Sequence, residues 1–498
     1  MTITLPQLES RLWEAANALR GPVDPADFKT YVFPMLFWKW LSDTWVYNHS
    51  QAVERWGGSL TPAIEADYHP FIMPENSLWA EVTKKTGGVL GSNIAQALDR
   101  IERANPKTLA RIFGDASWGD QERLPEQALV NMIKAFNSIT LNPATVDNDL
   151  LGAGYEYLLK QFADESGKKA GEFFTPREVV NLVIGLLDPQ PGESVYDPSC
   201  GSGGMLISTI SRVETEGKDS RTLRLYGQEV NLTTSAIARM NLFLHDIEDF
   251  DIKRGDTLAD PKFKNTDGSL RQFDVVVANP PFSLSPWARD DWASDPRAAT
   301  GLPPANSADY AFIQHMIASM KPGTGRVGVV MPLGVLFRGS AEGKIRQKLV
   351  EADLLEAVIG LPKDLFYNTG IPTCILIFRA PPKPEERKGK VLFVDASARF
   401  VPGKNRNSMS DKDVRAVLEA MRIGDAPNGE DGVAVRLVDF AEIKDNGFDL
   451  SITKYIKRAA EERATLDATL ADYRFARQSR LDAEKNMRNV LSEIGVNL

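Results

Sequence analysis

Apolar residues recur at helical spacing in the N-terminal part of the chain. The segments LPQLESRLWEAANALRG and DFKTYVFPMLFWKWLSDTWVYNHSQAVERW place them three and four positions apart, as on one face of an α-helix. Asp24 and Pro25, just before the second segment, suit a helix start because Pro is favoured in the first turn. The tryptophans that crowd this region are expected to fill its core. We therefore predict an all-helical domain over residues 1–150.

The pattern changes near residue 170, where short apolar runs rich in β-branched residues begin to alternate with helical segments. The runs are SVYDP (194–198), RLYGQEV (224–230), DVVVANPP (274–281), RVGVVMP (326–332), LLEAVIGLP (354–362), TCILIF (373–378) and VLFVDAS (391–397). Such strands are typical of a mostly parallel sheet covered by helices on both faces. The pattern predicts a doubly wound α/β domain over residues 151–400, with its ligand outside the carboxyl ends of the strands.

Residues 401–498 form a more polar C-terminal region that we expect to end in a helical extension. Ser410 and Asp413 are spaced as a capping box for a helix over residues 411–421. The last segment repeats apolar residues at spacings of four and three, at Leu466, Leu470, Tyr473, Met487, Leu491 and Ile494. This partial heptad is interrupted at Arg477 and Glu484. It fits equally an amphipathic helix packed on its own chain and one that contacts another subunit.

Composition and charge narrow the class of protein. The 498 residues are 43% hydrophobic and 25% charged, ordinary values for a soluble globular protein. There is no membrane-length apolar run and no signal-peptide pattern, so we expect a cytoplasmic protein without a membrane partner. The two cysteines and four scattered histidines predict neither disulfides nor a metal site. The net charge of −9 argues against a chain that holds nucleic acid tightly on its own.

A glycine-rich turn follows the first predicted strand. The segment DPSCGSGG, residues 197–204, leads into the helix MLISTIS. Its glycines let a ligand approach the backbone, and the helix N-terminus presents free N–H groups. The spacing matches neither G-x-G-x-x-G nor G-x-x-x-x-G-K-[ST], and no Lys follows. The turn therefore favours a nucleotide ligand without phosphates, although a purely structural turn is the alternative.

Acidic residues stand at the ends of three successive strands. Asp197 ends the first strand, Glu229 ends the second, and Asp256 follows a third short strand. Glu229 suits the two hydroxyls of a ribose, Asp256 an adenine amine, and Asp197 a cationic amino-acid tail. Each alone would more often be a solvated surface carboxylate. Together they describe a pocket with the shape of S-adenosylmethionine.

The segment GEFFTPREVV precedes the sheet. Thr175 as N-cap and Pro176 in the first turn predict the start of the helix REVVNLVIGLL. The aromatic pair Phe173 and Phe174 is a suitable wall for the methionine end of the cofactor, and a plain helix start is the alternative.

Asn279, Pro280, Pro281 and Phe282 follow the fourth strand. Pro lacks a backbone donor, so the Asn279 side chain and the Pro280 carbonyl offer two acceptors for both hydrogens of one NH₂ group. An aromatic amine is a poor nucleophile because its lone pair is delocalised into the ring. Holding both hydrogens out of the ring plane favours a nitrogen that can attack a methyl sulfonium. Phe282 offers a stacking face, worth about 1–3 kcal/mol, to a base flipped out of a duplex.

These motifs, in this order, resemble the amino-methylating DNA methyltransferases, and more closely the modification (M) subunit of type I restriction–modification systems. The resemblance extends to DNGFDLSITKYI in the C-terminal region. It implies a seven-stranded, Rossmann-like methyltransferase fold that binds S-adenosylmethionine. The catalytic residues that it implies are Asn279, Pro280, Pro281 and Phe282. The cofactor-binding residues that it and the strand-end pattern imply are Glu172, Phe173, Phe174, Thr175, Pro176, Arg177, Asp197, Gly201, Ser202, Gly203, Gly204, Glu229 and Asp256.

The resemblance also implies a substrate and partners. Asn rather than Ser or Thr at position 279 is similar to enzymes that methylate adenine N6 in double-stranded DNA. The implied partners are a specificity (S) subunit, joined by two M chains, and an optional restriction (R) subunit in a bacterial or archaeal cytoplasm, where methylation protects host DNA. The alternatives are a stand-alone adenine-N6 enzyme of another defence system, an RNA or glutamine methyltransferase with the same Asn-Pro-Pro motif, and a non-catalytic scaffold.

Residues 283–308 show no periodicity and are rich in Pro, Asp and Trp. A loop of this length inside a compact domain is usually functional or disordered. We expect it to be a lid near the flipped base that DNA or a partner orders.

Overall fold

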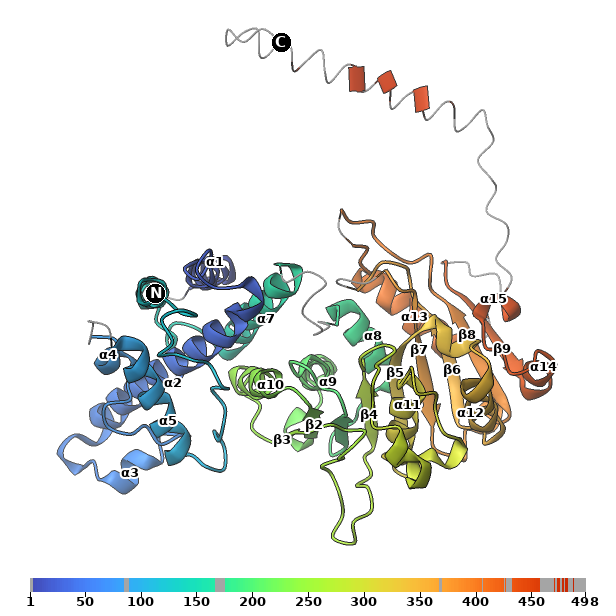
Figure 1. Ribbon diagram of the computed structural model, residues 1–498, viewed down its shortest axis with the longest axis horizontal. Helices are drawn as coiled ribbons and strands as arrows, with labels where there is room; N and C mark the ends of the chain where they lie inside the picture. Colours follow the sequence, from blue (N-terminus) through green and yellow to red (C-terminus); the bar gives the residue numbers. More distant parts are fainter. Residues whose placement is uncertain are drawn as a thin grey trace.

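The structure is a computed structural model that describes residues 3–84, 89–165, 175–366, 370–404, 406–424, 426, 432–456 and isolated positions between 470 and 487. A group of N-terminal helices lies beside an α/β unit (Figure 1). None of the described helices combines the length and the apolar character that crossing a membrane requires. The predicted terminal amphipathic helix lies outside the described residues, apart from those isolated positions.

The N-terminal part is helical, as predicted. Its helices are α1 (Leu5–Asn17), α2 (Phe28–Trp56), α3 (Pro62–Ala66), α4 (Trp79–Val82), α5 (Leu90–Ala104), α6 (Glu126–Asn137) and α7 (Asn148–Glu165). All of them except α3 contribute to one apolar core, in which Trp38, Trp79 and Trp118 are buried. Helix α7 adds Leu151 and Tyr155 to that core, so the helical packing continues past residue 150. We refer to these helices as the helical layer.

The α/β unit is built on a nine-stranded sheet with the order β3-β2-β1-β4-β5-β7-β6-β8-β9. The strands are β1 (Ser194–Asp197), β2 (Arg224–Glu229), β3 (Phe250–Arg254), β4 (Val275–Ala278), β5 (Arg326–Pro332), β6 (Leu355–Gly360), β7 (Thr373–Arg379), β8 (Lys390–Asp395) and β9 (Ala434–Asp439). Strand β7 is antiparallel to β5 and β6, and β9 is antiparallel to β8. The expected seven-stranded sheet is present from β3 to β6 of this order, and β8 and β9 extend it.

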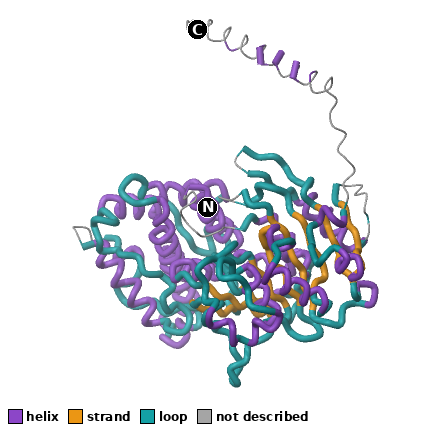
Figure 2. The backbone as a smooth tube through the Cα atoms, turned by 45° about the vertical axis from the view of Figure 1, so that its right-hand side comes forward, coloured by secondary structure: helices purple, strands orange, loops and turns teal. Residues whose placement is uncertain are grey.

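Helices cover both faces of the sheet (Figure 2). One face carries α8 (Arg177–Leu187), α9 (Gly204–Thr215), α10 (Leu232–Leu244) and α13 (Asp411–Ile423). The other carries α11 (Asp309–Ala318), α12 (Ser340–Glu351), α14 (Phe440–Asp445) and α15 (Ile452–Tyr455). Neighbouring strand residues such as Val195 and Tyr196 enter opposite cores, because successive side chains of a strand alternate between faces. The predicted capping box of Ser410 and Asp413 starts α13.

Helix α10 joins the two parts of the molecule. Its Ile237 and Met240 lie in the core of the helical layer, whereas its Leu242 lies in a core of the α/β unit. The Tyr155 hydroxyl of α7 donates a hydrogen bond to the Ile237 carbonyl at 3.0 Å. The guanidinium of Arg239 donates to backbone carbonyls of the helical layer. These contacts fix the helical layer against the sheet.

Residues 283–308 pack onto the α/β unit, and their role as a lid near the flipped base stays a prediction. They contain two short 3-10 helices, η5 (Asp290–Ser294) and η6 (Pro296–Thr300). Trp292 is fully buried and donates to the Leu258 carbonyl at 3.0 Å. Arg297 donates to the same carbonyl at 2.7 Å and lies over the Trp292 ring. An aromatic and a guanidinium thus anchor a segment that has no sequence periodicity.

We expect Trp292→Ala to lower the melting temperature and to open residues 290–300 to proteases. Removal of a buried Trp leaves a cavity and costs about 3–5 kcal/mol. Thermal melts and limited proteolysis with mass mapping measure the two effects. Trp56→Ala is the control, because that side chain is 41% exposed, and it should change both much less. Cleavage of the unsubstituted chain within 290–300 as fast as the Trp292 variant would contradict the prediction.

Candidate functional site

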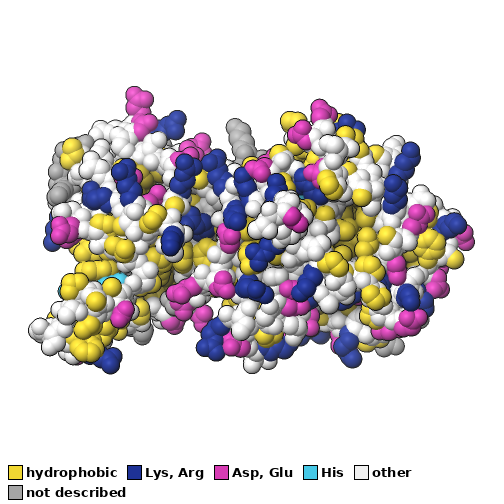
Figure 3. All heavy atoms as spheres, turned by 90° about the horizontal axis from the view of Figure 1, so that it is seen from below, with side chains coloured by type: hydrophobic (Ala, Val, Ile, Leu, Met, Phe, Trp, Pro, Cys, Tyr) yellow, Lys and Arg dark blue, Asp and Glu magenta, His cyan; other side chains and the backbone are white. Residues whose placement is uncertain are grey.

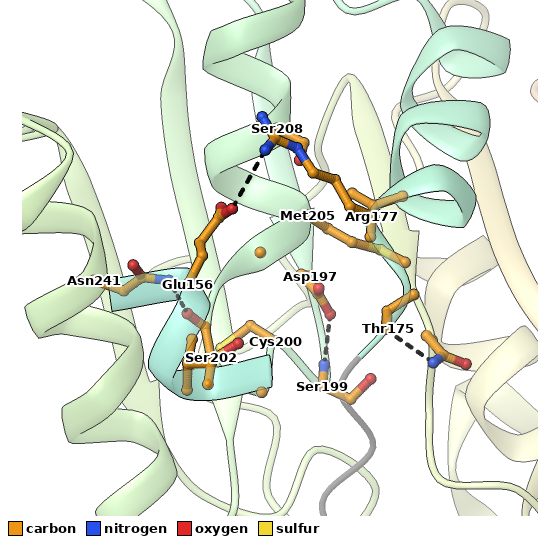
Figure 4. A pocket seen from close by; sticks show the side chains of 15 residues that line it. Glu156, Thr175, Arg177, Asp197, Ser199, Cys200, Ser202, Met205, Ser208 and Asn241 are labelled. Atoms are coloured by element: carbon orange, nitrogen blue, oxygen red, sulfur yellow. Dashed lines mark hydrogen bonds and ion pairs between the residues drawn. The ribbon is translucent and has the colours of Figure 1, made fainter. Parts of the chain in front are cut away.

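A cavity that is partly open to solvent lies at the carboxyl ends of β1 and β4. Its walls come from α7 of the helical layer and from α8, α9 and α10 of the α/β unit. Figure 4 shows side chains from these elements around the cavity, with Asn241 next to Ser202 of the glycine-rich turn and Glu156 facing Arg177. The cavity is where a doubly wound sheet is expected to bind its ligand.

The structure brings together predicted residues from three separate motifs. Those that line the cavity are Thr175, Arg177, Asp197, Gly201, Ser202, Gly204 and Asn279. The predicted residues Glu172, Phe173 and Phe174 lie outside the described residues. The cavity lining does not include Pro176, Gly203, Glu229, Asp256, Pro280, Pro281 or Phe282. Glu229 nevertheless contacts Gly201 of the cavity lining, as described next.

The glycine-rich turn is held in shape by side chains from two other elements. The backbone N–H of Gly201 donates to a carboxylate oxygen of Glu229 at 3.1 Å. The Asn241 amide of α10 donates to the Ser202 carbonyl at 2.9 Å. Gly201 and Gly203 have φ angles of 53° and 82°, a region in which Gly is strongly favoured. The turn therefore presents its backbone and the N-terminus of α9 to the cavity.

Asp197 ends β1 and is 2% exposed. The pKa of this carboxyl is raised to about 8, mainly by burial and also by nearby Glu229, although a hydrogen bond from the Ser199 N–H lowers it. That hydrogen bond measures 2.9 Å. Asp197 is thus largely protonated at neutral pH in the ligand-free protein, and a cationic ligand would favour its ionised form.

Asn279 and Thr175 connect the motif after β4 with the motif before α8. The Asn279 side-chain N–H donates to the Thr175 hydroxyl at 3.0 Å. Helix α8 has Pro176 as its N-cap and no side-chain cap bond, so the predicted N-cap role of Thr175 is wrong by one residue. The Asn279 side-chain oxygen is buried and has no hydrogen-bond partner among the described residues. Buried polar atoms usually have a partner, so this acceptor is available to a ligand.

A buried ion pair fixes the backbone directly after the Asn-Pro-Pro-Phe motif. The Ser283 N–H donates to Asp309 at 2.7 Å, and Arg338 pairs with the other oxygen of that carboxylate at 2.8 Å. Asp309 is 1% exposed. Ser283 has a φ of 51°, which is rare for residues other than Gly and persists where the surroundings enforce it. Phe282 lies edge-on to Phe366, with ring centroids 6.2 Å apart.

Asp256 is an exposed residue that caps its own turn. Its carboxylate accepts the N–H groups of Leu258 and Ala259 at 2.9 Å and 3.2 Å, and it does not line the cavity. Cys200 does line it. Burial raises the pKa of the Cys200 thiol, so the thiol is protonated at neutral pH and unsuited to be a nucleophile.

Sequence reasoning missed several residues that line the cavity, among them Glu156, Ser199, Met205 and Asn241. Asn241 is 1% exposed on an otherwise apolar stretch of α10, and a buried polar residue on such a helix is a usable signal. Glu156 reaches the cavity only because α7 packs beside α10, so no spacing in the sequence marks it.

Two family models match the chain. The model of the N-6 DNA methylase family matches residues 146–464, and that of the HsdM N-terminal domain matches residues 8–136. The MjaIX methylase subunit of a type I restriction enzyme from Methanocaldococcus jannaschii is 28% identical, over 98% of this chain and 91% of that protein. The HindI methylase subunit from Haemophilus influenzae is 32% identical, over 78% of this chain and 90% of that protein.

A solved structure is similar over almost the whole chain. The crystal structure of a type I restriction–modification system methyltransferase subunit from Streptococcus thermophilus superposes with a TM-score of 0.80 at 29% identity. The match covers 92% of this chain and 100% of that one.

Asp197 should make the stability of the ligand-free chain fall as pH rises. Its pKa is raised from 3.8 to about 8 by burial, so its stabilising effect is complete below about pH 4 and is lost as pH approaches 8. We expect the melting temperature to fall more steeply between about pH 5 and pH 8 in the unsubstituted chain than in Asp197→Asn. Melts across that range measure the slopes, with Asp256→Asn as an exposed control. Equal slopes in the unsubstituted and Asp197→Asn chains would refute this.

Proposed function

The chain belongs to the N-6 DNA methylase family, and on that premise we propose how its cavity carries out the reaction. It is the methyltransferase subunit of a type I restriction–modification system and an adenine-specific DNA methyltransferase. We propose that the cavity binds S-adenosylmethionine and that Asn279, Pro280 and Phe282 hold the target adenine. The observation that carries the proposal is the buried side-chain oxygen of Asn279, which has no hydrogen-bond partner in the described part of the chain and lines the same cavity as the glycine-rich turn.

The donor set of the cavity fits S-adenosylmethionine. The turn of residues 201–204 and the N-terminus of α9 offer backbone donors without a phosphate-binding Lys. Asp197 lines the cavity, and a cationic ligand bound there would favour its ionised form. Glu229, which supports the turn, remains our candidate for the ribose hydroxyls, and Asp256 for the adenine amine. When bound, the cofactor supplies an electrophilic methyl group on a sulfonium.

The residues of the chain then orient the amine that is methylated. The Thr175 hydroxyl accepts a hydrogen bond from the side-chain N–H of Asn279. This bond turns the carbonyl of the same amide toward the ligand. This oxygen and the Pro280 carbonyl accept the two hydrogens of the adenine N6 group, so that its lone pair leaves the ring plane. Phe282 stacks on the base that has left the duplex, which offsets part of the cost of flipping.

DNA recognition is assigned to a partner. The chain has a net charge of −9, and on the face in Figure 3 Lys and Arg side chains are interspersed with Asp and Glu. Tight DNA binding usually requires several phosphate contacts from basic residues. We propose that a specificity subunit reads the site, that two copies of this chain join it, and that a restriction subunit can be added. A stand-alone enzyme and a non-catalytic scaffold are the alternatives that the following experiments exclude or support.

Asn279→Ala should lower the methylation rate about 100-fold or more, because a group that acts mainly in the transition state is lost. Cofactor affinity should change little. Transfer of labelled methyl groups to unmethylated DNA, with the specificity subunit present, measures the rate, and calorimetry measures cofactor binding. Asn131→Ala removes an exposed Asn of α6 and is the control. An Asn279 variant that methylates normally would remove this residue from its role.

The chain alone should show little sequence-selective DNA binding, and the specificity subunit should create it. Fluorescence anisotropy with a duplex that contains the target site and with a scrambled duplex, each at the same salt concentration, measures the selectivity. Tight, selective binding by the chain alone would contradict the assignment of recognition to a partner and favour the stand-alone alternative.

A further inference from the structure

We infer that Glu156 of the helical layer is a further cofactor-binding residue that works together with Arg177. The amino-acid end of S-adenosylmethionine carries an ammonium and a carboxylate. The carboxylate of Glu156 binds the ammonium, and the guanidinium of Arg177 binds the carboxylate. This inference rests on the proposed cofactor. It adds a binding residue from outside the α/β unit, so that the helical layer is part of the cofactor site.

The two charges face one another across the rim of the cavity without a close contact. A Glu156 carboxylate oxygen lies 3.8 Å from a guanidinium nitrogen of Arg177 and the other lies 3.9 Å from His245. Hydrogen-bonded pairs lie at about 2.7–3.2 Å. Figure 4 shows Glu156 and Arg177 reaching toward each other from different elements. An exposed pair this loose contributes little by itself.

A zwitterionic ligand end matches this arrangement. An α-amino acid carries an ammonium and a carboxylate on one carbon, and the rim offers one acid and one guanidinium on the same cavity. Exchange of one loose pair for two charge-assisted hydrogen bonds is favourable, because such bonds are shorter and stronger. The guanidinium also suits a carboxylate geometrically.

Asp197 is less suited to the ammonium in the ligand-free protein. It is 2% exposed, and burial raises its pKa to about 8, so it is largely uncharged at neutral pH. The Glu156 side chain keeps 27% of its surface in contact with solvent. Glu156 therefore presents a solvent-accessible acid to the cavity, whereas Asp197 is almost inaccessible.

The position of Glu156 is fixed by the joint between α7 and α10. The adjacent Tyr155 is fully buried and bonded to the Ile237 carbonyl. A Cβ on Gly152 would lie 2.4 Å from the His245 ring, so the two helices meet closely just one turn before Glu156. The backbone of Glu156 is held this way, so only its side chain has to be ordered when it binds a ligand.

One consequence is a coupling between cofactor binding and the helical layer. Whatever shifts α7 relative to α10 changes the distance from Glu156 to the rest of the cavity. By linkage, a bound cofactor then favours the docked helical layer to the same extent.

Two probes separate this inference from the proposed function. S-adenosylhomocysteine carries the amino-acid end, whereas 5′-deoxy-5′-methylthioadenosine lacks it. Calorimetry on the full chain should show that Glu156→Gln lowers the affinity for S-adenosylhomocysteine about 10-fold or more, since hydrogen bonds to charged groups are lost. The affinity for methylthioadenosine should stay unchanged. Asp149→Asn, an exposed acid on the same helix, should affect neither probe.

Arg177→Gln provides a second test, because Arg177 is 72% exposed and its replacement should not disturb folding. Arg177→Gln should also lower the affinity for S-adenosylhomocysteine alone. Unchanged affinity for this probe in Glu156→Gln, or equal weakening of both probes, would overturn the inference and leave the proposed function intact. Failure of the unsubstituted chain to bind either probe would overturn both.

Discussion

Helix α10 has apolar side chains in two cores, and the functional site depends on this packing. Ile237 and Met240 belong to the core of the helical layer, and Leu242 belongs to a core of the sheet. Because the same helix also carries Asn241, which holds the glycine-rich turn, any movement of the joint would change the shape of the cavity. The helical layer and the α/β unit are therefore packed together through α10, although their sequence patterns are distinct.

The strand ends are tied together by residues from other motifs. Glu229 holds Gly201, Thr175 holds Asn279, and Asp309 holds Ser283. Each bond joins positions that are distant in the sequence, and each fixes a backbone or an amide that the proposed reaction uses. Parallel strands place such residues at one edge of the sheet, but the hydrogen bonds determine their orientation.

Most of the sheet could be predicted because its inner strands are continuous apolar runs. Strand β9 could not, since it is an edge strand in which only Val435 and Val438 are buried and it follows a polar stretch. The site could likewise be predicted only where the residues carry a local sequence pattern. The motifs predicted Asn279 and Asp197, which carry their own local pattern, but not Glu156, whose role depends on how α7 packs. The packing of residues 283–308 escaped prediction for a related reason, because Trp292 and Arg297 bind carbonyls far along the chain.

An acidic chain and a reaction on DNA are compatible because catalysis and DNA binding depend on charges that act over different distances. The groups around Asn279 act over hydrogen-bond distances inside a cavity, where burial sets their strength. Surface charges act over a screening length of about 8–10 Å, and they decide whether a chain attracts phosphates. A net charge of −9 leaves the hydrogen-bonding groups around Asn279 unaffected and weakens the attraction of the surface to phosphates. In the proposed assembly, a methylating subunit that holds DNA poorly by itself would act mainly where the specificity subunit holds the site, and its acidity would then contribute to sequence selectivity.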